Sequence, residues 1–180
     1  MPYTPGRRVL VLTHTGREDA ISAALQATRM FAEEGLVSVM LEQDVAAIRA
    51  AAGDPPEFAP EALGVDCELE DITLGLVLGG DGSVLRAADF VRGHNVPLLA
   101  VNLGHVGFLA ESERTDLHRT VQAIASESYV VIERMALDVV VLVEGREVAR
   151  TWALNEASVE KSHRELSLIH ISEPTRRRGI

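Results

Sequence analysis

The chain has 180 residues, of which 47% are hydrophobic, and it carries a formal net charge of −10 at pH 7 with an isoelectric point near 5.0. The acidic balance argues against nucleic acid and against an anionic membrane surface as partners, because such surfaces attract clustered Lys and Arg. No apolar run approaches the length of a membrane span, and the single cysteine excludes an internal disulfide. We therefore expect a soluble, cytoplasmic protein with a buried core.

The first two thirds of the chain alternate between short apolar runs and segments with helical periodicity. The apolar runs, typical of buried strands, are residues 9–12, 36–41, 74–78 and 96–101. The segments with helical spacing are residues 21–32, 44–52, 84–91 and 117–124. Residues 53–60 are rich in proline and are predicted to form a surface loop. This alternation predicts right-handed βαβ units, and hence an α/β domain with a parallel, Rossmann-like sheet.

The loop at residues 13–17 follows the first predicted strand. Loops at the carboxyl end of a parallel sheet commonly line the ligand crevice, so His14 and Arg17 are candidates for substrate contact. Exposed loop residues without such a role are nevertheless the more common case.

The most informative segment is the turn at residues 79–82, Gly-Gly-Asp-Gly, between a predicted strand and a predicted helix. Glycines let backbone N–H groups approach an oxyanion closely, and a helix N-terminus adds partial positive charge, so phosphate is the expected ligand. Asp81 would repel phosphate unless it holds Mg²⁺ or takes a proton from a hydroxyl nucleophile. The alternative is an ordinary turn in which Asp81 caps the helix. Neither G-x-x-x-x-G-K-[ST] nor G-x-G-x-x-G is present.

From residue 128 the sequence is β-rich and shows no helical pattern. Residues 129–143 favour a strand, 144–146 a hairpin turn and 147–158 a returning strand. We predict an α/β domain at residues 1–127 and an incomplete, truncated β domain at 128–165. Residues 166–180 resemble the translation of a sequencing-library adapter and are predicted to be a non-native tail.

Three motifs in this order resemble those of the bacterial NAD kinases, the polyphosphate/ATP-NAD kinase family, and the actinobacterial members are the most similar. The motifs are Gly79-Gly80-Asp81-Gly82, residues 102–109 (Asn-Leu-Gly-His-Val-Gly-Phe-Leu) and residues 153–156 (Ala-Leu-Asn-Glu). The resemblance implies an α/β domain followed by a β-sandwich, with NAD bound between them in a homo-oligomer, a dimer or tetramer. The chain departs from the family at Ser83, where threonine is common.

The resemblance implies transfer of a phosphoryl group from ATP or polyphosphate to the 2′-hydroxyl of the adenosine ribose of NAD, giving NADP. Asp81 would be the catalytic base, a role worth roughly 10²–10⁴-fold in rate. The residues that would bind phosphate are Gly79, Gly80, Gly82 and Ser83. The residues that would contact NAD are Asp81, Gly82, Arg86, Phe108, Asn155 and Glu156. A divalent cation, Mg²⁺, would screen the phosphates, and no protein ligand to it is assigned.

Two alternatives stay open. Phosphofructokinases and diacylglycerol or sphingosine kinases share the acidic glycine turn, although their subsequent substrate loops are not found here. A non-catalytic nucleotide-binding module could contain the same α/β half. Further family motifs, including a Gly-Ser-Thr-Ala-Tyr-like segment, are absent from the chain. We therefore expect the intact parent to be the NAD kinase, and the 180-residue chain to be inactive and prone to aggregate through unpaired strand edges.

Overall fold

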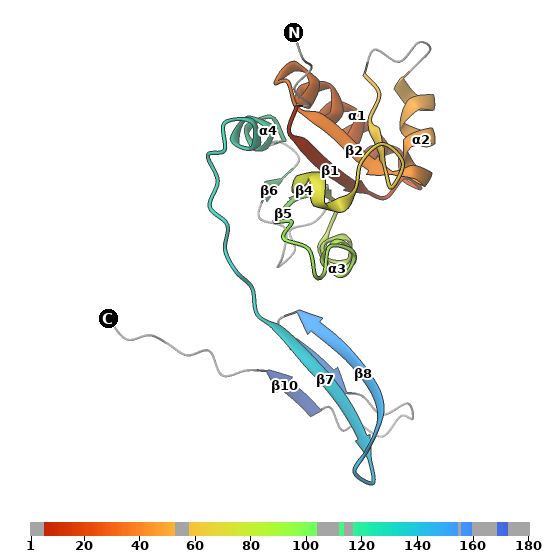
Figure 1. Ribbon diagram of the computed structural model, residues 1–180, viewed down its shortest axis with the longest axis vertical. Helices are drawn as coiled ribbons and strands as arrows, with labels where there is room; N and C mark the ends of the chain where they lie inside the picture. The colour runs from red at the N-terminus through yellow and green to blue at the C-terminus, as the bar shows by residue number, and fades with distance from the viewer. Residues whose placement is uncertain are drawn as a thin grey trace, which may run out of the picture. The chain divides into compact units, whose positions relative to one another are not determined.

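The computed structural model describes residues 6–52, 58–103, 112–113, 117–154, 156–159 and 169–172. The chain divides into two compact units, Met1–Val130 and Val131–Ile180. The first unit contains a six-stranded parallel sheet of order β3-β2-β1-β4-β5-β6 (Figure 1). Its strands are β1 (Arg8–Thr13), β2 (Val37–Leu41), β3 (Glu61–Leu63), β4 (Ile72–Leu78), β5 (Leu98–Asn102) and β6 (Ser112–Glu113). The predicted α/β, Rossmann-like architecture is confirmed, whereas the predicted boundaries at residues 127 and 165 stay predictions.

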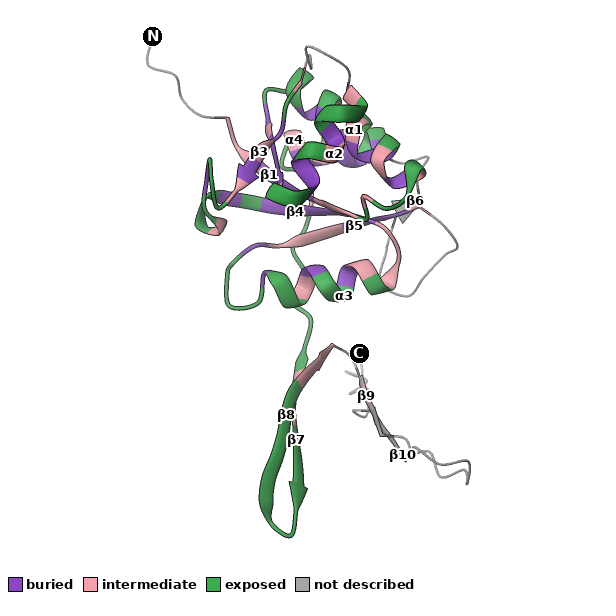
Figure 2. Ribbon diagram, turned by 90° about the vertical axis from the view of Figure 1, so that its right-hand side faces the viewer, coloured by how far each residue is buried: buried purple, intermediate pink, exposed green. Residues whose placement is uncertain are grey.

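Helices cover both faces of this sheet. The helices in the described part of the first unit are α1 (Glu18–Glu33), α2 (Glu42–Ala52), α3 (Asp81–Phe90) and α4 (Leu117–Ala125). Figure 2 shows α1, α2 and α4 on one face of the sheet and α3 on the other. Side chains alternate along β4 accordingly, because Leu76 and Leu78 pack in the core with α1 while Val77 packs with Val84 of α3. A central parallel strand buried on both faces is continuously apolar for this reason.

Helix α1 is terminated by a glycine. Gly35 has φ +71°, a backbone conformation that residues with a Cβ atom rarely adopt. Its N–H donates to the carbonyl of Ala32 at 3.1 Å, and the N–H of Leu36 donates to the carbonyl of Phe31 at 2.8 Å. These two hydrogen bonds form a Schellman motif, which satisfies the last carbonyls of the helix and turns the chain into β2.

Strand β3 was not predicted from the sequence. Its three residues pair with the end of β2, and Arg8 of β1 forms an ion pair with Glu61 at 2.6 Å. The backbone N–H of Ala62 donates to the carboxylate of Asp66 at 2.7 Å. A one-turn 3₁₀ helix, η1 (Leu69–Asp71), then leads into β4. Of the predicted proline-rich loop, residues 53–57 lie outside the described residues.

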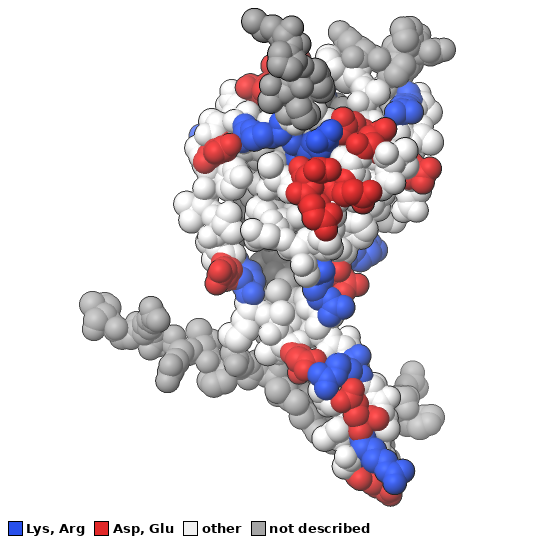
Figure 3. All heavy atoms as spheres, viewed as in Figure 1, with Lys and Arg blue, Asp and Glu red and all other residues white. Residues whose placement is uncertain are grey.

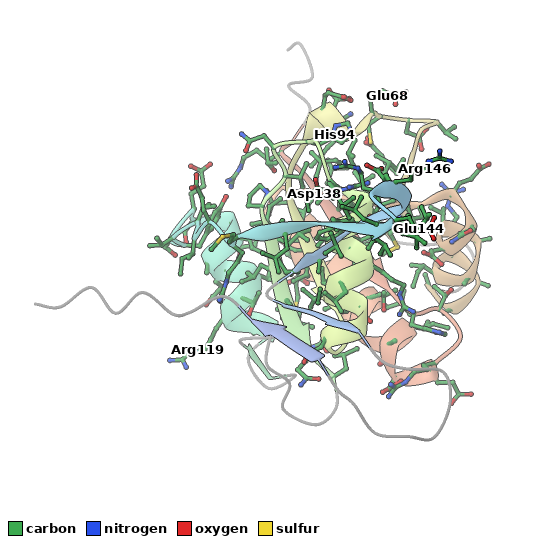
Figure 4. The ribbon with its side chains drawn as sticks, turned by 90° about the horizontal axis from the view of Figure 1, so that it is seen from below. Glu68, His94, Arg119, Asp138, Glu144 and Arg146 are labelled. Atoms are coloured by element: carbon green, nitrogen blue, oxygen red, sulfur yellow. The ribbon has the colours of Figure 1, made fainter. Side chains whose placement is uncertain are left out.

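The second unit contains a hairpin of β7 (Ala136–Val143) and β8 (Arg146–Leu154), joined at a turn that confirms the prediction. Glu144 and Gly145 both have positive φ, +51° and +77°, which matches the twist of an antiparallel pair. Glu144 and Arg146 lie at the turn end of the hairpin (Figure 4). Basic and acidic side chains alternate along this unit (Figure 3), and among them Arg150 pairs with both Glu147 and Asp138.

Other parts of the second unit differ from the sequence predictions. The strand predicted to start at residue 129 begins only at Ala136, because residues 128–135 have β propensity but are not paired in a ladder. The returning strand is divided into β8 and a short strand, β9 (Glu156–Val159). Strand β10 (Ile169–Ser172) pairs antiparallel with β9. The adapter origin of residues 166–180 stays a prediction.

Candidate functional site

A cavity lies in the first unit at the carboxyl end of the sheet. The strand order reverses between β1 and β4, since β2 and β3 extend from β1 in one direction and β5 and β6 extend from β4 in the other. Ligands of open parallel sheets bind outside the carboxyl ends of the strands at such a reversal. The cavity has a volume of about 360 Å³. It is lined by residues 12–16 at the end of β1 and in the loop that follows, by Leu41, Gln43 and Asp44 around the start of α2, by Val77 of β4, and by Ser83, Arg86, Ala87 and Phe90 of α3.

The Gly-Gly-Asp-Gly turn joins β4 to α3 beside this cavity. Gly80 is the N-cap of α3, and its carbonyl accepts hydrogen bonds from the N–H groups of Ser83 at 2.8 Å and Val84 at 3.2 Å. Asp81 is the first helical residue and is half-buried. The N-cap residue is therefore Gly80, and not Asp81 as the ordinary-turn alternative assumes. A carboxylate in the first helical turn is stabilised by the positive end of the helix dipole.

The glycines of the turn differ in what surrounds them. A Cβ atom at Gly79 would meet Oγ of Ser83 and would lie 2.8 Å from Cβ of Ser83, closer than carbon atoms pack. A Cβ atom at Gly80 or Gly82 would meet nothing within 4 Å among the described residues, and neither glycine has a positive φ. Packing within the chain therefore explains Gly79. The open space beside Gly80 and Gly82 suits the close approach of a ligand to the backbone.

A buried carboxylate lies on the opposite side of the cavity. Asp44 near the start of α2 is 7% exposed, and its Oδ1 accepts a hydrogen bond from Oγ1 of Thr15 at 2.8 Å. The bond joins the loop after β1 to the helix after β2, and both residues line the cavity. Sequence analysis assigned neither residue to the site. The available signal was an acidic residue just after the second strand, a position that often contacts ribose in dinucleotide-binding folds.

The two candidates in the loop after β1 differ in position. His14 lines the cavity, and its Nδ1 accepts a hydrogen bond from the N–H of Gly16 at 3.2 Å. Arg17 is the N-cap residue of α1, and its guanidinium pairs with Asp19 at 2.6 Å. This pairing lowers the pKa of the Asp19 carboxyl, mainly through the hydrogen bond from Arg17. Arg17 thus serves the start of α1, whereas His14 remains a candidate for ligand contact.

The remaining predicted site residues lie in different parts of the chain. Ser83 and Arg86 share one face of α3 and line the cavity together. Arg86 is exposed and forms no hydrogen bond or ion pair with another described residue. Phe108 and Asn155 lie outside the described residues. Glu156 begins β9 in the second unit, and the description does not extend to its side chain.

Among the described residues, no group of three or more His, Cys, Asp or Glu side chains is placed to hold a metal ion. Within the same residues, every helix is too short or too polar to cross a membrane.

Comparison with known proteins places this site in a family context. The sequence profile of the ATP-NAD kinase N-terminal domain matches residues 9–129. The NAD kinase of Leifsonia xyli subsp. xyli is 48% identical over 160 residues, which are 88% of this chain and 52% of the relative. The NAD kinase of Thermobifida fusca is 45% identical over 164 residues, which are 88% of this chain and 49% of the relative.

The fold also has a counterpart among solved structures. The crystal structure of yeast NADH kinase in complex with NADH superposes with a TM-score of 0.67 at 19% identity, covering 85% of this chain and 48% of the yeast protein. At this identity the likeness is one of fold. The chain spans about half the length of the curated relatives that it matches.

Proposed function

The chain belongs to the ATP-NAD kinase N-terminal domain family, and from this membership we propose that it forms the nucleotide-binding half of a NAD kinase. Such an enzyme transfers a phosphoryl group from ATP or polyphosphate to the 2′-hydroxyl of the adenosine ribose of NAD. The observation that carries the proposal is the turn before α3, where Asp81 lies between two glycines with open space beside them. An exposed backbone at a helix N-terminus suits phosphate, and the neighbouring carboxylate suits a hydroxyl nucleophile.

Asp81 acts in this proposal as the general base. Its carboxylate accepts the proton of the 2′-hydroxyl while that oxygen attacks the terminal phosphorus of the donor, and the shortened donor leaves with its bridging oxygen. Phosphoryl transfer depends chiefly on positioning and charge stabilisation, which the N–H groups at the start of α3 supply. Gly80 and Gly82 leave room for the phosphate to reach those N–H groups. Ser83, on the same helical turn, adds a hydroxyl that can donate to a phosphate oxygen.

A divalent cation, Mg²⁺, fits the groups present at this turn. Mg²⁺ is commonly held by one or two carboxylates together with substrate phosphates rather than by a cage of protein ligands. The described residues contain no separate metal-binding cluster, so the phosphates of the donor would supply ligands to the ion and Asp81 would stay the general base. When bound with the donor, the ion would neutralise the negative charge that develops on the transferred group.

The proposed partners are NAD and the phosphoryl donor. The contacts to NAD inferred from the family resemblance are Gly82, Arg86, Phe108, Asn155 and Glu156 around Asp81. Assembly as a homo-oligomer and a cytoplasmic location, both expected from the family resemblance, belong to the same proposal.

The test is an assay of NADP formation from NAD, ATP and Mg²⁺. Because the chain spans about half of its relatives, we would assay it alone and as a chimera completed with the part of the Leifsonia xyli relative beyond the match. We expect the chimera to make NADP and the Asp81→Asn variant to lose at least about a hundredfold in kcat. Glu42→Gln, which removes an exposed carboxylate outside the cavity lining, is the matched control and should keep the wild-type rate.

The result also separates the alternative functions. A chimera that phosphorylates a sugar phosphate or a lipid but makes no NADP would favour the other kinases that share the acidic glycine turn. Binding of nucleotides without any phosphoryl transfer would favour a non-catalytic module.

A further inference from the structure

The cavity contains a group that the proposed phosphoryl transfer does not use. Asp44 lies in its lining, 7% exposed and hydrogen-bonded to Thr15. Burial of a carboxylate costs free energy, so a carboxylate that lines a ligand cavity calls for hydrogen-bond donors. Direct contact with a phosphate group is disfavoured here, because the two negative charges repel each other and no cluster of His, Cys, Asp or Glu among the described residues is placed to hold a bridging metal ion.

We propose that this cavity takes the nucleoside of a nucleoside triphosphate donor, and that Asp44, oriented by Thr15, accepts hydrogen bonds from the hydroxyls of its ribose. This inference rests on the proposed function and adds the class of the donor and the residue that recognises it. Ribose hydroxyls are donors that a carboxylate accepts with a charge-assisted hydrogen bond. The volume of about 360 Å³ lies within the range of small-molecule sites, roughly 300–1,000 Å³.

The place of Asp44 in the fold supports ribose as its ligand. Asp44 follows the end of β2 by three residues, and β2 lies beside β1 in the sheet. Open parallel sheets that bind dinucleotides commonly use an acidic residue at the end of this second strand to bind ribose hydroxyls. The hydrogen bond from Thr15 fixes the carboxylate against the loop after β1, so its orientation does not depend on the ligand.

The rest of the lining suits the other parts of a nucleotide. Leu12, Val77 and Ala87 supply apolar surface, and the ring of Phe90, which is 43% exposed, can pack against a flat base. Ser83 and Arg86 carry a hydroxyl and a positive charge close to the start of α3. Because Asp44 repels phosphate and Arg86 attracts it, the charges favour one orientation, with the ribose at Asp44 and the phosphates directed towards α3.

The sheet order assigns the cavity to the donor rather than to NAD. Strand β4, which carries the Gly-Gly-Asp-Gly turn, lies between β1 and β5. The end of β1 lines the cavity, whereas Phe108, which the family resemblance places at NAD, follows β5 in the sequence. Two substrates that react beside Asp81 must approach it from different directions. Arg86, which the resemblance places against NAD, also lines this cavity and so can reach the phosphates of the donor as well.

The experiment compares Asp44→Asn with wild type in the chimera described above. We expect the KM for ATP to rise by at least about tenfold, since a hydrogen bond to a charged group is lost, while kcat and the KM for NAD stay within about twofold. The wild-type KM for 2′,3′-dideoxy-ATP should exceed that for ATP by a similar factor. Asp44→Asn should not raise the KM for dideoxy-ATP any further. Glu42→Gln should leave all constants unchanged. The KM for polyphosphate, which has no ribose, should not rise in Asp44→Asn.

The contrary results are distinct from failure of the proposed function. Suppose that the wild-type chimera makes NADP. If Asp44→Asn then leaves the KM for ATP unchanged, or raises the KM for NAD instead, the inference about Asp44 is overturned while the proposed function stands. If circular dichroism shows that Asp44→Asn does not fold, the wild-type chimera alone still tests the inference. Equal KM values for ATP and 2′,3′-dideoxy-ATP would then overturn it. If wild type makes no NADP, the proposed function fails, and the inference is then decided by calorimetric titration of ATP and dideoxy-ATP into the 180-residue chain, where equal affinities would reject it.

Discussion

Alanine substitution should have opposite effects on stability at Gly79 and Gly82. A Cβ atom at Gly79 would lie 2.8 Å from Cβ of Ser83, so the start of α3 must move away from β4 to accept it. Overpacking of this kind costs about 1–3 kcal/mol in the free energy of unfolding. At Gly82 nothing lies within 4 Å of the added atom, and alanine there stabilises the first turn of α3 by up to about 1 kcal/mol.

The assay is urea denaturation of the 180-residue chain followed by circular dichroism at 222 nm. The α-helices of the described residues all lie in the first unit, so this signal reports on that unit. A Ser83→Gly substitution should relieve much of the cost of Gly79→Ala, because it removes the atoms that clash. The reasoning is refuted if Gly79→Ala is as stable as wild type, or if Ser83→Gly brings no relief. In the chimera, Gly82→Ala should lose NADP formation despite its stability, because the methyl group occupies the space assigned to the phosphate.

Two further predictions concern buried polar groups away from the site. Oγ of Ser38 in β2 is buried and has no hydrogen-bond partner among the described residues, so Ser38→Ala should leave the urea midpoint unchanged or raise it; a clear decrease would reveal a missed partner. Burial raises the pKa of the Cys67 thiol, with a smaller contribution from Glu61, so the folded chain keeps a proton that the unfolded chain releases. Stability should therefore fall as pH rises above about 8.5, the ordinary pKa of the unfolded thiol, and should fall less in Cys67→Ala; equal pH dependence of the two chains would contradict this.

The central strands and the glycine turn could be predicted because each depends on local sequence. Strand β4 ends in an apolar run, Leu74–Leu78, that stops at glycines, and burial on both faces of a parallel sheet produces that pattern. The end of α1 was equally predictable, since Gly35 is needed for a positive φ at the point where the helical periodicity stops.

The edge strand β3 could not be predicted in this way. Its Glu-Ala-Leu sequence has neither a continuous apolar run nor an alternation long enough to detect. It forms because β2 offers an unpaired edge and because Arg8 pairs with Glu61, a residue distant in sequence. Such tertiary partners are not visible in a window of neighbouring residues.

The candidate site shows the same division. The turn with Asp81 could be found because its residues are consecutive, and Ser83 and Arg86 follow it on one helix. Asp44 was passed over because a single acidic residue at the start of a helix is ordinary in sequence. Only folding brings it to the same cavity as Thr15, through the parallel pairing of β1 with β2.

The sheet order has a consequence for the N-terminal end of the protein. Strand β1 is the first strand of the chain, yet in the sheet it lies between β2 and β4 and pairs with both. Chain termini usually tolerate trimming. Here, removal of residues up to Thr13 by a protease, or by a start site placed too far downstream, would delete the strand that connects the two halves of the sheet. The remaining β3-β2 pair and the β4-β5-β6 group would then share no ladder, so an expression vector should include the whole of β1.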